Sequence, residues 1–403
     1  MQPAALDDDR LARHNALVLA AAHGVGGANA GIVITTGGLV GAYLSGEPAL
    51  ATLPFSVYMI GVACGTVPAS RISRSYGRRA AFLAGALIGA AGGLVAMVAI
   101  LSGSFALFCA GTALCGVWGA FVQLFRFAAA DDASPAFRPR AISWVLAGGI
   151  LAGIVGPQLI IATRDLTDPI PFAGAYAAQV GVTLVAGLII AIFLKPSRPV
   201  PVPAAGTVVR SVPEILRDRR LLVAMAAGVA SFFLMNFVMT ASPLAMVACG
   251  HSLSDAAWTI QWHVLAMYGP SFFTGGLIAR HGATRIGALG FVLIAAGSAV
   301  ALTGLSTLHF DAALILLGVG WNFSFISATA MVAAAHAPAE RNRVQMVNDF
   351  AVFGTVTVGS LMSGGVLHVF GWQGINIGVF PIAAVGLAIL MLALPRDRRG
   401  AAA

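Results

Sequence analysis

The sequence has few charged residues. Asp, Glu, Lys and Arg make up 9% of its 403 residues, whereas 59% of the residues are apolar. Soluble domains carry about 25% charged residues, so this composition excludes an ordinary soluble protein. Apolar runs of about 18 or more residues recur along most of the chain, and a helix of that length crosses the hydrocarbon layer of a bilayer. We therefore expect an all-α polytopic membrane protein embedded in a lipid bilayer.

Cysteine is also scarce. The chain has four cysteines, Cys64, Cys109, Cys115 and Cys249, and it has no CxxC pair. This pattern indicates neither a zinc site nor a disulfide framework. No nucleophile, pair of catalytic carboxylates or phosphate-binding loop stands out in the sequence, so we expect neither an enzyme nor a bound cofactor.

The net charge of +8 reflects membrane topology. All but Arg126 and Arg164 of the 23 basic residues lie in the two tails or in every second loop. This alternation is typical of cytoplasmic loops and not of a nucleic-acid-binding face, and it predicts that both termini are cytoplasmic. The apolar runs predict twelve spans, over residues 16–42, 50–70, 80–101, 104–127, 141–163, 172–194, 221–248, 255–279, 285–304, 311–335, 344–368 and 372–394.

One long polar connection, residues 195–220, divides the chain almost in half. It is basic and rich in proline, and it follows the sixth span. Short loops recur at matching places, because FRPR (137–140) and ERNR (340–343) both join the fourth and fifth spans of a half. Two similar halves are typical of secondary transporters. We therefore expect six-helix bundles over 1–194 and 221–403, joined by a cytoplasmic linker over 195–220.

Carboxylates are absent from the middle of every predicted span. Proton-coupled transporters of sugars or cationic drugs usually need one there, as a proton carrier or a counter-ion. Their absence argues against those two classes of transporter.

Methionine is concentrated in residues 225–267, which hold five of the 12 methionines. Met235 with Met239, and His263 with Met267, have the i, i+4 spacing that places two side chains on one helix face. The two helices would run antiparallel across a short hairpin, with the pairs at matching depths. Three thioethers and one imidazole suit monovalent copper. Methionine at this spacing also serves in ordinary packing.

Two sets of motifs resemble known transporters. The loop SRISRSYGRR (70–79) is similar to the G-x-x-x-D-R-x-G-R-R loop of the major facilitator superfamily at Gly77, Arg78 and Arg79, although Arg74 and Ser70 replace its Asp and its first Gly. The stretches LMNFVM (234–239) and WHVLAM (262–267) resemble the Met-x-x-x-Met and His-x-x-x-Met motifs in the seventh and eighth spans of the CcoA-type copper importers of that superfamily.

This resemblance implies a major facilitator fold and import of copper, as Cu(I), across the bacterial inner membrane. The imported copper would supply assembly of haem–copper cytochrome oxidase. Copper would be the transported substrate, with alternating access around Met235, Met239, His263 and Met267. We expect the chain to act as a monomer and to bind no nucleic acid.

Several further residues are weaker candidates. Cys249 and His251 in the hairpin could relay copper inward. Arg126 with Asp131 and Arg341 with Asp349 could form ion pairs of a cytoplasmic gate. Candidates for the polar lining of a cavity are Asn29, Trp118, Gln123, Trp321 and Asn322.

Two alternatives to copper import stay open. One is a transporter of a small organic solute or of a metal chelate, which predicts a cavity lined by aromatic and amide side chains. The other is a copper sensor or assembly factor that binds the metal without net flux.

Overall fold

The computed structural model describes residues 9–131, 133–134, 137–196, 211–336 and 340–391. Within these ranges the chain is helical apart from short connections, and it contains no β-strand. The expected all-α membrane architecture is therefore confirmed. The first half contains α2 (Arg10–Gly26), α3 (Ala28–Ser45), the 3₁₀ helix η1 (Pro48–Leu50), α4 (Leu53–Leu101), α5 (Phe105–Gln123), α6 (Phe125–Asp131), α7 (Arg138–Thr163) and α8 (Ala173–Phe193).

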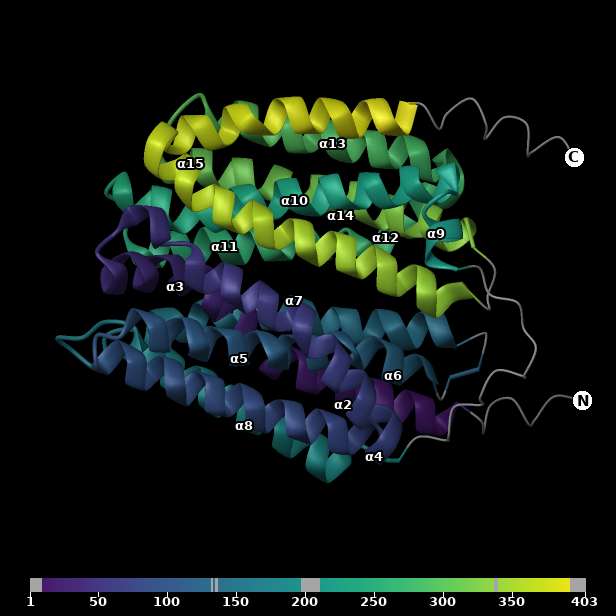
Figure 1. The fold of residues 1–403 in the computed structure, drawn as a ribbon, viewed down its shortest axis with the longest axis horizontal. Coiled ribbons are helices and arrows are strands. Elements are labelled where there is room, and N and C mark those ends of the chain that lie inside the picture. The colour runs from purple at the N-terminus through teal and green to yellow at the C-terminus, as the bar shows by residue number, and fades with distance from the viewer. Residues whose placement is uncertain (1–8, 132, 135–136, 197–210, 337–339, 392–403) are drawn as a thin grey trace, which may run out of the picture. The chain divides into compact units, whose positions relative to one another are not determined.

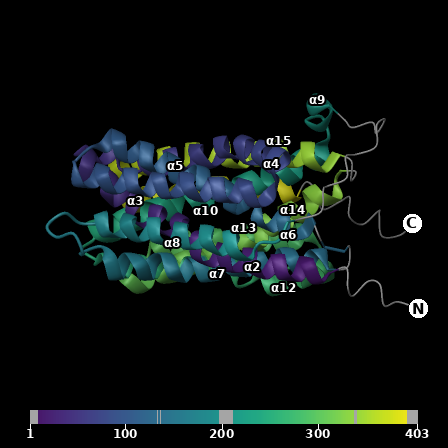
Figure 2. The same cartoon turned by 90° about the horizontal axis from the view of Figure 1, so that it is seen from below.

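The second half begins with the short helix α9. It contains α9 (Val212–Ile215), α10 (Arg219–Ala248), α11 (Leu253–Tyr268), α12 (Ser271–His281), α13 (Ala283–Ala301), α14 (Thr307–Ala334) and α15 (Arg341–Met391). The contacts between its residues divide the chain into two compact units. Unit 1 is Met1–Pro201 with Ala256–Gln261, and unit 2 is Val202–Asp255 with Trp262–Ala403. Within each unit the helices run side by side (Figures 1 and 2).

Ten helical segments of the described chain are long and apolar enough to cross a membrane. Nine of them correspond one to one with predicted spans. The tenth, Arg343–Met391, holds two spans, because Gly371 leaves helical geometry at φ 66°. The remaining predicted span, 255–279, is divided into α11 and α12, since Pro270 has no backbone N–H and interrupts the helix. These elements account for the twelve expected crossings.

Glycine lets α4 and α5 of unit 1 pack backbone to backbone. A Cβ atom placed on Gly116 would overlap the carbonyl oxygen of Tyr58, and one placed on Gly61 would overlap the carbonyl oxygen of Ala113. Small residues at such crossings let membrane helices approach closely. The spacing of the two helices in unit 1 therefore depends on these glycines.

In unit 2, glycine likewise lets α13 and α14 pack closely. A Cβ on Gly290 would lie 2.5 Å from the carbonyl oxygen of Gly320, and a Cβ on Gly320 would lie 2.7 Å from the carbonyl oxygen of Gly290. Helix α10 also packs against α14, where the hydroxyls of Ser231 and Ser324 are 2.6 Å apart. These contacts hold α10, α13 and α14 as the frame of unit 2.

Helix α9 docks on unit 2. The side chain of Ile215 is fully buried and packs with α10, α14 and α15, against Leu221, Ala224, Met225, Val332 and Val344. Ser211 and Glu214 form a reciprocal capping box at the start of the short helix. The last residues of the predicted linker therefore belong structurally to the second bundle.

Truncating Ile215 should weaken this docking. We expect Ile215→Ala to cost about 2–4 kcal/mol, because a fully buried isoleucine leaves a cavity. The thermal unfolding midpoint of the detergent-solubilised protein measures the effect. Leu216→Ala is the matched control, since the neighbouring Leu216 is 44% exposed and its truncation leaves the midpoint almost unchanged. Equal midpoints for the two variants would contradict the docking.

Candidate functional site

The four predicted copper ligands are all buried. Met235 and Met239 lie on α10, and His263 and Met267 lie on α11. The Nδ1–H of His263 donates to the carbonyl oxygen of Leu314 on α14, at 2.7 Å. Within the described ranges, His, Cys, Asp and Glu side chains form no group of three that could hold a metal ion. Each pair shares one helix as the spacing predicts, and the assignment of the four residues to one site stays a prediction.

The two candidate relay residues, Cys249 and His251, lie in the hairpin between α10 and α11. Cys249 is the residue that caps the C-terminus of α10, and its free thiol is exposed. His251 Nε2–H donates to the carbonyl oxygen of Leu305 at 2.7 Å, and its Nδ1 lies 3.3 Å from the hydroxyl of Thr307. These bonds tie the hairpin between α10 and α11 to the start of α14. The ring nitrogens of His251 are thus engaged, and a relay role stays a prediction.

Each of the two predicted gate ion pairs includes one residue whose side chain the structure does not describe. Arg126 lies on α6 with its guanidinium over the ring of Phe127, 4.8 Å from the centroid. Asp349 accepts a hydrogen bond from the neighbouring Asn348 at 3.2 Å. The side chains of Asp131 and Arg341 are outside the described part of the structure, so both pairs remain predictions.

Three of the residues predicted to line a polar cavity instead form hydrogen bonds with other groups of the protein. Two of these three residues lie in unit 1. Asn29 accepts from Gln179 Nε2 at 2.9 Å and donates to the carbonyl oxygen of Cys115 at 3.1 Å. Trp118 Nε1–H donates to the carbonyl oxygen of Gly26 at 3.1 Å. Their polar atoms therefore fasten helices of unit 1 to one another. Gln123, by contrast, is exposed at the end of α5.

The third, Asn322, fastens α14 to the interruption between α11 and α12. Its Nδ2 donates to the carbonyl oxygen of Met267 at 2.6 Å and lies 2.7 Å from the hydroxyl of Ser271. Its Oδ1 accepts from the hydroxyl of Thr274 at 2.6 Å. One amide thus bonds to both sides of Pro270, which explains how an interrupted span is held inside the membrane, where exposed backbone groups are costly.

Aromatic rings from four helices gather beside this point. Trp321 and Phe325 of α14 are stacked, with centroids 5.1 Å apart and planes 11° apart. Phe232 of α10 meets them edge-on at 5.4 and 5.1 Å, and it lies 6.2 Å from Phe353 of α15. Tyr268 of α11 lies 6.3 Å from Trp321. We call these five residues the aromatic cluster; such an arrangement offers ring faces and edges to a planar solute.

The indole of Trp321 also carries an unused polar group. Its side chain is 6% exposed, and its buried Nε1–H has no acceptor in the described structure. Sequence reasoning selected Trp321 but missed the rest of the cluster. The i, i+4 spacing of Trp321 and Phe325 was a signal for their stacking, whereas the rings on α10, α11 and α15 join them only through the fold.

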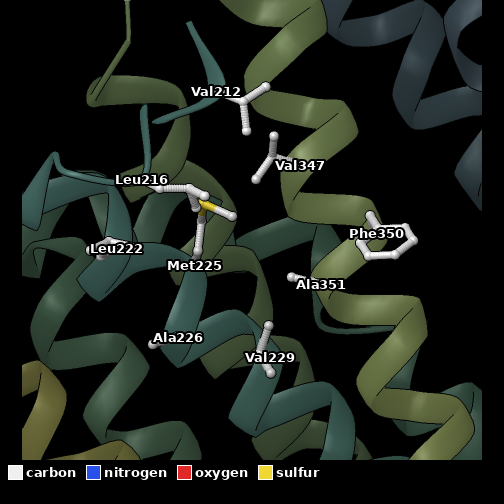
Figure 3. A pocket seen from close by; sticks show the side chains of 9 residues that line it. All are labelled: Val212, Leu216, Leu222, Met225, Ala226, Val229, Val347, Phe350 and Ala351. Carbon is white, nitrogen blue, oxygen red and sulfur yellow. The ribbon is translucent and has the colours of Figure 1, made fainter. Parts of the chain in front are cut away.

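An apolar pocket of about 590 Å³ lies on unit 2 between α9, α10 and α15 (Figure 3). On α10, Val229 follows Met225 by four residues and Phe232 follows Val229 by three. These steps place all three side chains on one face of the helix. The pocket therefore continues the face of α10 that carries the cluster. It is lined by Val212, Leu216, Leu222, Met225, Ala226, Val229, Val347, Phe350 and Ala351. These side chains suit an apolar or aromatic solute better than an ion.

Comparisons with known proteins identify relatives along nearly the whole chain. The riboflavin transporter RfnT of Brucella anthropi is 49% identical over 398 residues, which cover 99% of this chain and 100% of that protein. The uncharacterized MFS-type transporter YdeG of Bacillus subtilis is 30% identical, over 84% of this chain and 82% of that protein. The crystal structure of a mutant of the nucleoside transporter NupG shares the fold, with a TM-score of 0.73 at 12% identity over 95% of this chain and 99% of NupG.

The prediction of copper import is wrong, and so is the inferred supply of copper to cytochrome oxidase assembly. A relative that is 49% identical over its full length is a riboflavin transporter. The physical reason for the error is that methionine at i, i+4 spacing in an apolar span, as at Met235 and Met239, also serves ordinary helix packing. The alternative of a small organic solute agrees better with that relative.

Met239 should therefore matter for packing. We expect Met239→Ala to cost about 2–5 kcal/mol, because this side chain is only 3% exposed, and Met239→Leu to cost less than about 1.5 kcal/mol, because it keeps the volume. Thermal unfolding in detergent measures both. Cellular copper content should be the same for both variants and the parent, and a copper deficit in Met239→Leu would contradict this role.

The family follows from the sequence match and agrees with the fold. The model of the Major Facilitator Superfamily matches residues 18–354, which is most of the chain. The helical segments are those of a multi-pass membrane protein. The chain therefore belongs to the major facilitator superfamily, whose members are transporters and not enzymes.

Proposed function

We propose that this protein imports riboflavin, or a closely related flavin, across the bacterial cytoplasmic membrane. The observation that carries the proposal is the aromatic cluster, in a chain 49% identical to a riboflavin transporter. The flavin is the substrate and no resident cofactor is needed. The distribution of arginine supports cytoplasmic termini, and a single chain with two bundles is sufficient for transport as a monomer.

The chemistry of a flavin fits the cluster. Its ring system is planar, tricyclic and aromatic, so it can stack on Trp321 or meet the edge of Phe232. The unpaired Nε1–H of Trp321 supplies one donor for a ring carbonyl or ring nitrogen. The apolar pocket includes Val229, about one turn before Phe232 on α10, and its apolar lining suits the hydrophobic benzenoid end of such a ring. A hydrated metal ion or a simple sugar offers no comparable π face.

Counterflow in liposomes tests the proposal without knowledge of the driving force. Purified protein is reconstituted into vesicles loaded with unlabelled riboflavin, and radiolabelled riboflavin is added outside. We expect labelled riboflavin to accumulate transiently, several-fold above protein-free vesicles. Uptake no faster than in protein-free vesicles would reject riboflavin transport. Saturable binding without time-dependent accumulation would favour a binding protein without flux.

A further inference from the structure

Five buried side-chain polar atoms of unit 2 have no hydrogen-bond partner in the described structure. Three are oxygen atoms, of Thr240, Ser327 and Asn376. The two nitrogen atoms are Nε1 of Trp321 on α14 and Nε2 of His263 on α11. Buried polar atoms are almost always paired, and a histidine inside a membrane span is costly to keep. A bound solute could pair both nitrogen atoms at once, since they lie on neighbouring helices of unit 2.

The hydrogen bond of His263 determines what its second nitrogen can do. The carbonyl oxygen of Leu314 can only accept, so Nδ1 carries the proton. In the neutral ring Nε2 is then a hydrogen-bond acceptor. Trp321 Nε1–H can only donate. A ligand that pairs both atoms must therefore offer an acceptor at one place and an N–H or O–H donor at another.

The imidazole is held in a defined place. Helix α14 approaches α11 at Gly318, where a Cβ atom would lie 2.7 Å from the carbonyl oxygen of His263. The ring of His263 is fully buried, and the bond to Leu314 fixes its orientation. Nε2 is therefore a preorganised acceptor.

The spacing of Leu314 and Trp321 along α14 indicates the size of the ligand. Leu314, which marks the level of His263, precedes Trp321 by seven residues of α14. That is about two helical turns, or roughly 10 Å. This distance exceeds a single sugar or pyrimidine ring and is comparable to a tricyclic ring that carries a flexible arm.

Building on the proposed riboflavin transport, we infer that His263 Nε2 accepts a hydrogen bond from a hydroxyl of the substrate's polyol arm. The flavin ring lies on the aromatic cluster, and Trp321 Nε1–H donates to an acceptor on that ring. The ring is therefore recognised at Trp321, and the arm is recognised about two turns away at His263. His263 makes the site prefer a flavin with a hydroxylated arm.

Competition in the counterflow assay tests this inference. The competitors are riboflavin and lumiflavin, which has the same ring but a methyl group in place of the polyol arm. Wild-type protein should bind riboflavin about five- to tenfold more tightly than lumiflavin, as expected for one hydrogen bond. Equal affinities would overturn the inference, whereas failure of counterflow itself would instead reject the proposed function.

Two substitutions distinguish recognition of the polyol arm from recognition of the flavin ring. His263→Asn keeps an amide N–H near the position of Nδ1 and removes Nε2, so the riboflavin preference should fall to near one while lumiflavin binding is unchanged. Trp321→Phe keeps a ring and removes the N–H, so both flavins should weaken together. The ratio of the two affinities does not depend on how much protein is folded. An unchanged preference in His263→Asn, or an equal loss for both flavins in that variant, would overturn the assignment.

Discussion

Replacing Trp321 with alanine should lower the apparent affinity for riboflavin by about 5- to 150-fold, which corresponds to the roughly 1–3 kcal/mol by which an aromatic side chain stabilises a stacked base. The substitution removes the largest ring of the aromatic cluster, its stack with Phe325 and the unpaired Nε1–H together. Initial rates of counterflow over a range of riboflavin concentrations give the affinity. Quenching of flavin fluorescence on binding gives an independent value.

The chain offers a matched control for that substitution. Trp262 lies on α11 with 46% of its side chain exposed, and it is not part of the aromatic cluster. Trp262→Ala therefore removes an indole of the same size from outside the site and should leave the affinity within about twofold of the wild type. If both variants lose affinity alike, the cluster is not the riboflavin site.

Introducing leucine at Gly116 should remove most of the folded protein. Even the Cβ atom would overlap the carbonyl oxygen of Tyr58, so a full side chain must push α4 and α5 apart. Overpacking of this kind costs about 3 kcal/mol or more, a large part of the roughly 5–15 kcal/mol that stabilises a typical protein. The yield of monodisperse protein after detergent extraction measures the loss.

Gly181 on α8 is the matched control for Gly116. It lies in the same unit and is also helical, but a Cβ placed on it meets no atom within 4 Å. Gly181→Leu should therefore give a wild-type yield, helped by the better helix propensity of leucine. Normal yield for Gly116→Leu would mean that the crossing of α4 and α5 is looser than its geometry indicates.

The spans were predictable because hydropathy acts over whole helices. Nine predicted spans correspond to single helical segments, and the alternation of arginine led to an even number. The interruption at Gly269 and Pro270 was not predicted, although both residues are visible in the sequence. An apolar run over 255–279 predicts a crossing, but it does not show whether the helix is continuous. A break inside the membrane needs a residue that hydrogen-bonds to the groups on either side of it. Here that residue is Asn322, about 50 residues away in the sequence.

The site was less predictable than the fold. Spacing shows that Met235 and Met239 share a helix face, but not whether that face meets a ligand or another helix. The same limit hid the aromatic cluster, because Phe232, Tyr268 and Phe353 come from three different helices and are brought near Trp321 only by the fold. A polar atom left without a partner, such as Trp321 Nε1, is visible only once the surrounding atoms are placed.

The docking of α9 has a practical consequence for dividing the gene. Because Ile215 packs against α10, α14 and α15, a separately expressed second half that starts at Arg219 would expose the apolar surface that Ile215 covers. A second polypeptide that starts at Val202 keeps α9 and its capping box attached. Co-expressed halves should therefore reassemble into an active transporter more readily with the earlier start.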